Sequence, residues 1–227
     1  MQPHDFWQEI HPPATFDVNR GHQHFYPASL ADGRQIRLPI RPLADGSHAL
    51  ASLIVNQASF AVLDALATDL AARLKESAPD VVVGLPTLGL TLAAEVAKKL
   101  HHGRYVPLGT SRKFWYEEAL SVPLSSITTP DQVKRLYVDP RMLPLLKGRR
   151  VALVDDVISS GRSIRAGLEL LDTLGIRPVV IGAAMLQSDR WRDASAYPYD
   201  GWTDIVRGCF GTPMLEKDAG GLWHDYT

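Results

Sequence analysis

Runs of consecutive apolar residues, rather than alternating ones, mark the centre of this chain. They cover residues 81–85, 105–108, 151–154 and 179–186. Strands buried on both faces of a parallel sheet are apolar throughout, whereas half-exposed strands alternate. Residues 90–100 and 164–174 instead place apolar side chains three or four positions apart, as amphipathic helices do. The repeated order of strand, helix and strand predicts an α/β fold with a parallel sheet flanked by helices.

A longer helical pattern precedes the first of these strands. Its members are spaced mostly by three, four or seven positions, with one gap at Asn56 and Gln57: Leu50, Leu53, Ile54, Leu63, Leu66, Leu70 and Leu74. Ser47 stands where a helix N-cap would accept a backbone hydrogen bond. The pattern predicts a helix over residues 48–76 that begins after Ser47.

The two ends of the chain do not share this order. Residues 22–41 alternate on both sides of Asp32–Gly33, which is the pattern of a β-hairpin. Residues 189–227 are aromatic and rich in glycine and include Trp191, Trp202 and Trp223. We therefore expect an N-terminal arm and hairpin (1–47) and a C-terminal tail (189–227) to form a small cap, or hood, over a core at 48–188.

His22 and His24 would share one face of the first strand of the hairpin. Two histidines can begin a metal site, but no third ligand stands near them in the sequence. A pair that faces solvent or substrate fits the pattern better.

Residues 109–132 interrupt the alternation of strand and helix. The sequences on both sides of Thr129–Asp131 alternate, which predicts an antiparallel ribbon. Connections of this length in a compact domain are usually functional lids or disordered. We expect the segment to be a mobile lid.

Composition excludes several classes of protein. The 227 residues are 45% hydrophobic and 22% charged, as in a globular protein of one domain with additions. The 24 basic residues balance 25 acidic ones, so charge favours neither nucleic acid nor an anionic membrane as a partner. The single Cys209 permits no internal disulfide and is interpreted as a small core residue. No signal-peptide pattern and no membrane-length apolar stretch is present, which predicts a cytoplasmic protein.

The strand at 151–154 leads into the stretch with the most chemistry. Asp155 and Asp156 follow it, and a turn, Ser159-Ser160-Gly161-Arg162-Ser163, opens the next helix. Ligands of open α/β sheets bind beyond the carboxyl ends of the strands. The free N–H groups at a helix N-terminus bind phosphate, and Gly161 lets the backbone approach it. The acidic pair would then hold a sugar attached to that phosphate.

This unit of strand, acidic pair, turn and helix resembles the signature of the type I phosphoribosyltransferases. The resemblance implies a binding site for the 5-phosphate of phosphoribosyl pyrophosphate at Ser159, Ser160, Gly161, Arg162 and Ser163. It implies that Asp155 and Asp156 bind the ribose hydroxyls, directly or through a Mg²⁺ ion that also bridges the pyrophosphate. Arg162 is a departure, because a small residue is usual at its position.

Two further segments match in the expected order. The sequence GLPTLGL resembles the pyrophosphate loop of adenine and xanthine phosphoribosyltransferases, in which backbone amides bind the anion. The matching residues are Pro86, Thr87, Leu88 and Gly89, with Leu88 where a basic or small polar residue is often found. Arg112 and Lys113 match an Arg–Lys pair that begins a mobile loop in those enzymes. They would bind the departing pyrophosphate.

The resemblance implies a Mg²⁺-dependent, homodimeric phosphoribosyltransferase that transfers ribose 5-phosphate to a nucleobase and releases pyrophosphate. The glutamate that contacts adenine in the adenine enzymes has no counterpart at residues 126–129, and the aromatic residues 114–116 could stack a planar ring. An oxo-substituted, purine-type base is therefore the expected acceptor. The alternatives are a regulatory protein that senses phosphoribosyl pyrophosphate without catalysis and a binding subunit without activity. Balanced charge and the lack of length for a separate DNA-binding domain favour the enzyme over the regulator.

Other interpretations of the same residues fit less well. Residues 84–91 have the outline of a P-loop, but Leu90 stands where that loop requires its lysine. Response-regulator receivers also carry an acidic pair after a strand, although near the start of the chain. A purely structural role, with Asp155 capping a helix, is the third alternative.

Overall fold

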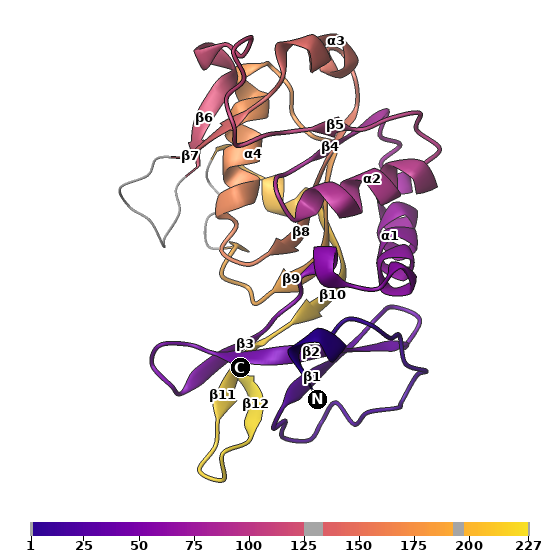
Figure 1. The fold of residues 1–227 in the computed structure, drawn as a ribbon, viewed down its shortest axis with the longest axis vertical. Coiled ribbons are helices and arrows are strands. Elements are labelled where there is room, and N and C mark those ends of the chain that lie inside the picture. The colour runs from indigo at the N-terminus through magenta and orange to yellow at the C-terminus, as the bar shows by residue number, and fades with distance from the viewer. Residues whose placement is uncertain (1, 125–133, 193–197, 227) are drawn as a thin grey trace.

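A parallel sheet forms the centre of the protein. The computed structural model describes residues 2–124, 134–192 and 198–226. Its central sheet has five strands in the order β10-β9-β8-β4-β5, and every neighbouring pair is parallel (Figure 1). The strands are β4 (Val81–Gly84), β5 (Val106–Pro107), β8 (Val151–Ile158), β9 (Val180–Gln187) and β10 (Val206–Thr212). The predicted α/β fold is confirmed.

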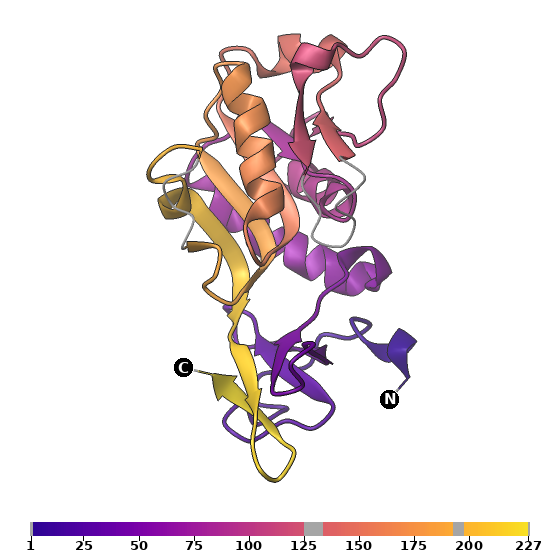
Figure 2. The same ribbon diagram turned by 90° about the vertical axis from the view of Figure 1, so that its left-hand side faces the viewer.

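Helices cover both faces of this sheet. They are α1 (Phe60–Lys75) and α2 (Gly89–Lys99) on one face and α4 (Arg162–Thr173) on the other (Figures 1 and 2). Successive side chains of a strand point to opposite faces. Accordingly, Val82 packs in the cluster that contains α1 and α2, whereas Val81 and Val83 pack in the cluster that contains α4. Burial on both faces explains why the strands are apolar without interruption.

Shorter helical turns connect these elements. They are α3 (Leu143–Leu146) and the 3₁₀ turns η1 (Pro3–Asp5), η2 (Val55–Gln57), η3 (Glu118–Leu120), η4 (Pro140–Met142) and η6 (Trp202–Ile205). Among the residues that the structure describes, no helix has the length and apolar character needed to cross a bilayer.

The helix predicted at 48–76 begins much later than expected. Ser59, not Ser47, is its N-cap, and the Ser59 hydroxyl accepts a hydrogen bond from the Val62 amide at 3.2 Å. Residues 48–51 instead form strand β3 (His48–Ala51), with Ala49 and Ala51 fully buried. The leucines of this stretch have helical spacing by coincidence. The side chains that alternate into the core, as a strand requires, are the small alanines at 49 and 51. The gap at residues 56–57 falls in the 3₁₀ turn that precedes the helix.

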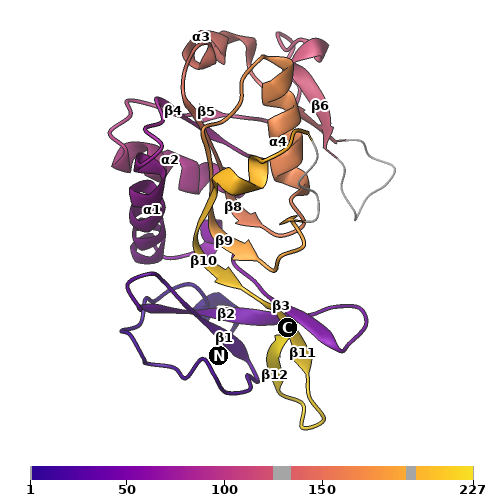
Figure 3. The same cartoon turned by 180° about the vertical axis from the view of Figure 1, so that it is seen from behind.

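The hood is a second, antiparallel sheet built from both ends of the chain. Its order is β1-β2-β3-β11-β12, with β1 (Phe25–Ser29), β2 (Gln35–Pro42), β11 (Met214–Lys217) and β12 (Trp223–Tyr226). β1 and β2 are the predicted hairpin around Asp32–Gly33. Figures 1 and 3 show this sheet at one end of the core. The predicted hood of N- and C-terminal segments is therefore confirmed.

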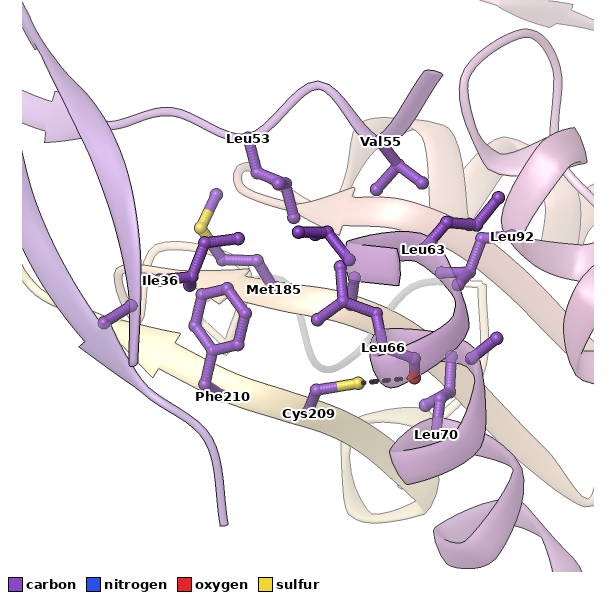
Figure 4. Close-up of a cluster of buried hydrophobic side chains, with 14 of the residues drawn as sticks. Ile36, Leu53, Val55, Leu63, Leu66, Leu70, Leu92, Met185, Cys209 and Phe210 are labelled. Atoms are coloured by element: carbon purple, nitrogen blue, oxygen red, sulfur yellow. Dashed lines mark hydrogen bonds between the residues drawn. The ribbon is translucent and has the colours of Figure 1, made fainter. Parts of the chain in front are cut away.

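One apolar cluster joins the hood to the core (Figure 4). Ile36 from β2 lies near Met185 from β9 and Phe210 from β10. A buried hydrogen bond from Gln187 Nε2 to the Ala51 carbonyl, at 2.6 Å, links β9 to β3. Cys209 is buried as predicted, and its thiol donates to the Leu66 carbonyl at 3.3 Å. These contacts fix the hood beyond the carboxyl ends of the parallel strands.

The C-terminal tail does not all belong to the hood. Strand β10 extends the parallel sheet beside β9. Trp191 and Trp202 pack together in the cluster under α4, with ring centroids 6.1 Å apart, whereas Trp223 lies in β12. The divisions at 1–47, 48–188 and 189–227 remain predictions as folding units.

The predicted ribbon and the histidine pair have different outcomes. β6 (Ser121–Leu124) pairs antiparallel with β7 (Lys134–Tyr137), which confirms the ribbon, although its tip lies outside the described residues.

His22 precedes β1 and is buried where its backbone pairs with Trp223, whereas His24 is exposed. The part of the chain that the structure describes holds no group of three or more residues suited to bind a metal.

Candidate functional site

The acidic pair lies inside strand β8 rather than after it. The strand continues to Ile158, and Asp155 pairs with Ala183 of β9. Both carboxylates are nearly inaccessible, at 5% exposure for Asp155 and 7% for Asp156. The Asp156 amide donates to Asp155 Oδ1 at 2.9 Å. The sequence analysis placed the pair after a strand that ends at Val154, which is four residues too early, because it took the aspartates as the boundary.

Burial dominates the electrostatics of this pair. It raises the pKa of Asp155 well above its ordinary value, and the neighbouring charge of Asp156 raises it further. Burial also raises the pKa of Asp156. Within the described residues, no lysine, arginine or histidine forms an ion pair with either group. Two buried carboxylates without a cation are costly, and a hard cation with oxygen ligands would lower that cost. The pair therefore suits Mg²⁺.

The predicted phosphate loop leads from β8 into α4. Gly161 is the N-cap in the left-handed conformation, with φ at 74°, and α4 begins at Arg162. A small pocket of about 90 Å³ is lined by residues 157–164. The N–H groups of the first turn of α4 have no partner within the helix and can therefore bind an anion. Ser163 and Arg162 are exposed, and Arg162 has no hydrogen-bond or ion-pair partner among the described residues.

The predicted pyrophosphate loop lies directly beside the acidic pair. β4 and β8 are parallel neighbours with Gly84 opposite Val154, and the loop after β4 enters α2 at Gly89. The Pro86–Thr87 peptide is cis. A Cβ on Gly89 would lie 2.6 Å from Asp155 Oδ1. Thr87 and Leu88 are exposed. The structure thus places the N-terminus of α2 against the acidic pair, on the strand that leads into the N-terminus of α4.

Arg112 and Lys113 form no ion pair with Asp155 or Asp156 among the described residues. They follow β5, the strand next to β4, and both side chains are exposed. Arg112 pairs with Glu118 at 3.6 Å, and Glu118 also pairs with Arg135 at 3.0 Å. Neither basic residue forms an ion pair with the acidic pair in this structure.

Arg190 was missed by the sequence analysis. It lies three residues beyond β9, and its Nη2 donates to Ser159 Oγ at 3.0 Å. The signal that could have found it is topological. β9 is the parallel neighbour of β8, with Leu186 opposite Ile158, so the segments after the two strands must lie side by side.

The comparisons with known proteins identify the family of this chain. The model of the phosphoribosyl transferase domain matches residues 52–217. The chain belongs to this family.

About a third of the residues in the aligned segments are identical between this chain and two family relatives. The "Bifunctional protein PyrR" of Streptomyces coelicolor is 33% identical over 127 residues, which cover 55% of this chain and 61% of that protein. An adenine phosphoribosyltransferase of Albidiferax ferrireducens is 36% identical over 111 residues, or 48% of this chain and 52% of that protein. The matches therefore span little more than half the length of these relatives.

Solved phosphoribosyltransferase structures share the fold at lower identity. The adenine phosphoribosyltransferase of Thermoanaerobacter pseudethanolicus superposes with a TM-score of 0.59 and 19% identity, covering 77% of this chain and 95% of that one. The enzyme of Giardia lamblia complexed with 9-deazaadenine gives a TM-score of 0.59 and 21% identity, covering 77% and 93%. Both likenesses support the type I phosphoribosyltransferase fold.

Proposed function

We propose that this protein transfers ribose 5-phosphate from phosphoribosyl pyrophosphate to a nucleobase and releases pyrophosphate. The observation that carries the proposal is the contact between Gly89 and Asp155. It places the N-terminus of α2 beside the buried acidic pair, and the N-terminus of α4 follows the same strand as that pair. Two anion sites flanking two carboxylates suit a sugar that carries a phosphate group at each end.

Each part of the site has a separate role in binding. Residues 159–163 hold the 5-phosphate through backbone amides and hydroxyl groups. Residues 86–89 hold the pyrophosphate, mainly through backbone amides, because Pro86 has no N–H group and Leu88 has no polar side chain. Asp155 and Asp156 orient the ribose hydroxyls between these two groups. Holding both ends of the substrate fixes C1 for attack by the base.

The reaction needs little covalent chemistry from the protein. The C1–oxygen bond breaks, its electron pair leaves with the pyrophosphate, and a ring nitrogen of the base forms the new bond to C1 and gives up its proton to the pyrophosphate or to water. Positive charge grows on the ribose as the bond loosens, and the buried carboxylates favour that charge. Arg112 and Lys113 stabilise the departing pyrophosphate once they have moved onto it. Asp155 and Asp156 would also hold Mg²⁺, which supplies charge neutralisation at the pyrophosphate.

The acceptor that we propose is an oxo-substituted, purine-type base. The support is the lack of a glutamate at residues 126–129, a segment outside the described residues. Phe114 is 97% exposed and touches Trp115 edge to face with the ring centroids 4.7 Å apart, so a face of its ring is open to a base, whereas Arg141 lies 4.3 Å over the ring of Trp115.

A second candidate is a regulator that binds phosphoribosyl pyrophosphate without turnover. The relatives whose name describes them as bifunctional keep this candidate open. The balance of 24 basic and 25 acidic residues favours the enzyme over a nucleic-acid binder. We further propose a homodimer in the cytoplasm.

The deciding experiment is a pyrophosphate-release assay with phosphoribosyl pyrophosphate, Mg²⁺ and a panel of purines and pyrimidines. We expect turnover with an oxo-purine, and its loss in Asp155→Asn and Asp156→Asn. Asp172→Asn is the matched control, because Asp172 is exposed on α4 and pairs with Arg177 at 3.5 Å. Binding without pyrophosphate release for any base would support the regulator. Absence of binding would refute both candidates.

A further inference from the structure

Arg190 is held against the phosphate loop by two serine hydroxyls. Its Nε donates to Ser188 Oγ at 3.2 Å, and its Nη2 donates to Ser159 Oγ at 3.0 Å. Ser188 directly follows β9 and adopts a left-handed backbone conformation, with φ at 58°. Such a conformation is uncommon for a residue with a side chain and marks a sharp change of chain direction. The turn after β9 thus carries Arg190 to the edge of the loop.

The hydrogen bond between Arg190 and Ser159 has a defined direction. A guanidinium can only donate, so Ser159 Oγ must accept. The hydroxyl hydrogen of Ser159 is then left to donate to another group. Ser159 lines the pocket of about 90 Å³ at the N-terminus of α4. Arg190 therefore orients Ser159 as a donor toward an anion in that pocket.

No carboxylate neutralises Arg190 among the residues that the structure describes. The nearby Arg192 differs, because it pairs with Asp189 at 2.9 Å and stacks over Trp191 at 4.4 Å. An arginine that is positioned by two hydroxyls but has no acidic partner keeps its charge available for a ligand. Arginine also matches phosphate geometry with parallel donors.

We propose that Arg190 is a further residue of the 5-phosphate site, in addition to residues 159–163. It supplies a positive charge beside Ser159, Ser160 and Gly161, which carry none. It also fixes the Ser159 hydroxyl in the donating orientation. A phosphate oxygen bonded to Ser159 would lie about 2.7 Å from Oγ. Ser159 Oγ lies only 3.0 Å from Nη2, so the guanidinium charge is one hydroxyl group away from that oxygen and attracts it. This inference rests on the proposed function.

Calorimetric titration of the whole protein with ribose 5-phosphate tests the assignment. Arg190→Ala should weaken binding of ribose 5-phosphate by about tenfold or more, because the variant loses both the positive charge beside the phosphate and the hydrogen bond that orients Ser159. Arg190→Lys should recover part of the affinity. Arg192→Ala is the matched control and should bind as the wild type does. In turnover, Arg190→Ala should raise KM for phosphoribosyl pyrophosphate far more than it lowers kcat.

Titration with pyrophosphate alone separates the two ends of the substrate. Its affinity should be unchanged in Arg190→Ala. A loss of pyrophosphate affinity with normal ribose 5-phosphate binding would overturn the assignment to the 5-phosphate. Normal binding of both ligands by Arg190→Ala would overturn the inference and leave the proposed function intact. If the wild-type protein binds neither ribose 5-phosphate nor phosphoribosyl pyrophosphate, the proposed function is refuted and the inference falls with it.

Discussion

Gly89 and Asp155 lie so close together that no side chain fits between them. A Cβ on Gly89 would be 2.6 Å from Asp155 Oδ1 and 2.8 Å from Asp155 Cα. The second contact is to backbone, which cannot rotate away as a side chain can. This contact fixes the position of the proposed pyrophosphate loop, which follows β4, relative to the acidic pair on β8.

Replacing Gly89 with alanine should therefore disturb both folding and binding. We expect a loss of about 1–3 kcal/mol in the free energy of unfolding, as for an overpacked core position. Affinity for phosphoribosyl pyrophosphate should fall as well, because α2 and the acidic pair must separate. Urea unfolding and calorimetry measure the two effects. Gly103→Ala is the control, since a Cβ there meets nothing within 4 Å. Equal stability of the two variants would contradict the close approach.

Gly161 is required because of its left-handed backbone conformation. Comparison with Gly148 separates the effect of this conformation on stability from the effect of the position on phosphate binding. Its φ of 74° disfavours any other residue, and a Cβ would also lie 3.3 Å from Trp191 Cβ. Gly148 has a similar φ of 71° with open space around it. Alanine at either position should cost about 1–3 kcal/mol of stability through the left-handed backbone. Only Gly161→Ala should also weaken ribose 5-phosphate binding. Unchanged binding in that variant would argue against the loop as the phosphate site.

The buried acidic pair should make the ligand-free protein less stable than it could be. Because burial raises the pKa of Asp155, the folded state holds its proton more tightly than the unfolded state does. Stability from this group is present at pH values below the ordinary carboxyl pKa and is lost as pH rises toward the raised pKa. Asp155→Asn removes this loss.

Asp155→Asn should accordingly raise the Tm at pH 7 while lowering turnover by about 100-fold or more. The gain in Tm should shrink as the pH is lowered toward 4, where the wild-type carboxyl is protonated. Differential scanning fluorimetry across this range, without ligand or Mg²⁺, is the measurement. A Tm for the variant below that of the wild type at neutral pH would show that the charged carboxylate stabilises the fold.

Local patterns in the sequence predicted much of this architecture. Unbroken apolar runs located β4, β8 and β9, and the glycine turn before α4 located the phosphate loop. These features depend on neighbours in the sequence. The start of α1 was misplaced because alternating alanines at 49 and 51 gave a weaker signal than the leucines around them.

Features that depend on strand pairing could not be predicted in the same way. β10 contains two glycines and a cysteine and has no unbroken apolar run, so only its pairing with β9 identifies it. Arg190 reaches Ser159 across 31 positions of sequence because β8 and β9 are adjacent. The contact between Gly89 and Asp155 likewise follows from β4 lying beside β8.

The last prediction concerns the segment that begins at Gly109. Arg112 pairs with the exposed Glu118 at 3.6 Å, so it would have to exchange this contact for one with a bound pyrophosphate. Exposed ion pairs contribute little to stability, which makes this contact easy to exchange. A reactive ribose cation also needs shielding from water during transfer. We therefore expect Arg112 and Lys113 to close onto the site when Mg²⁺ and phosphoribosyl pyrophosphate bind.

Limited proteolysis and a double substitution test this closure. Cleavage around residues 112–116 should be rapid in the free protein and suppressed by substrate with Mg²⁺. Replacing Arg112 and Lys113 with alanine should lower turnover by about 10²–10³-fold while changing stability by less than about 0.5 kcal/mol. Lys147 and Arg149, exposed near the opposite end of β8, give a matched double alanine control that should retain full turnover. Equal cleavage with and without substrate would mean that the segment is a fixed wall, because closure must bury these peptide bonds to protect the ribose from water.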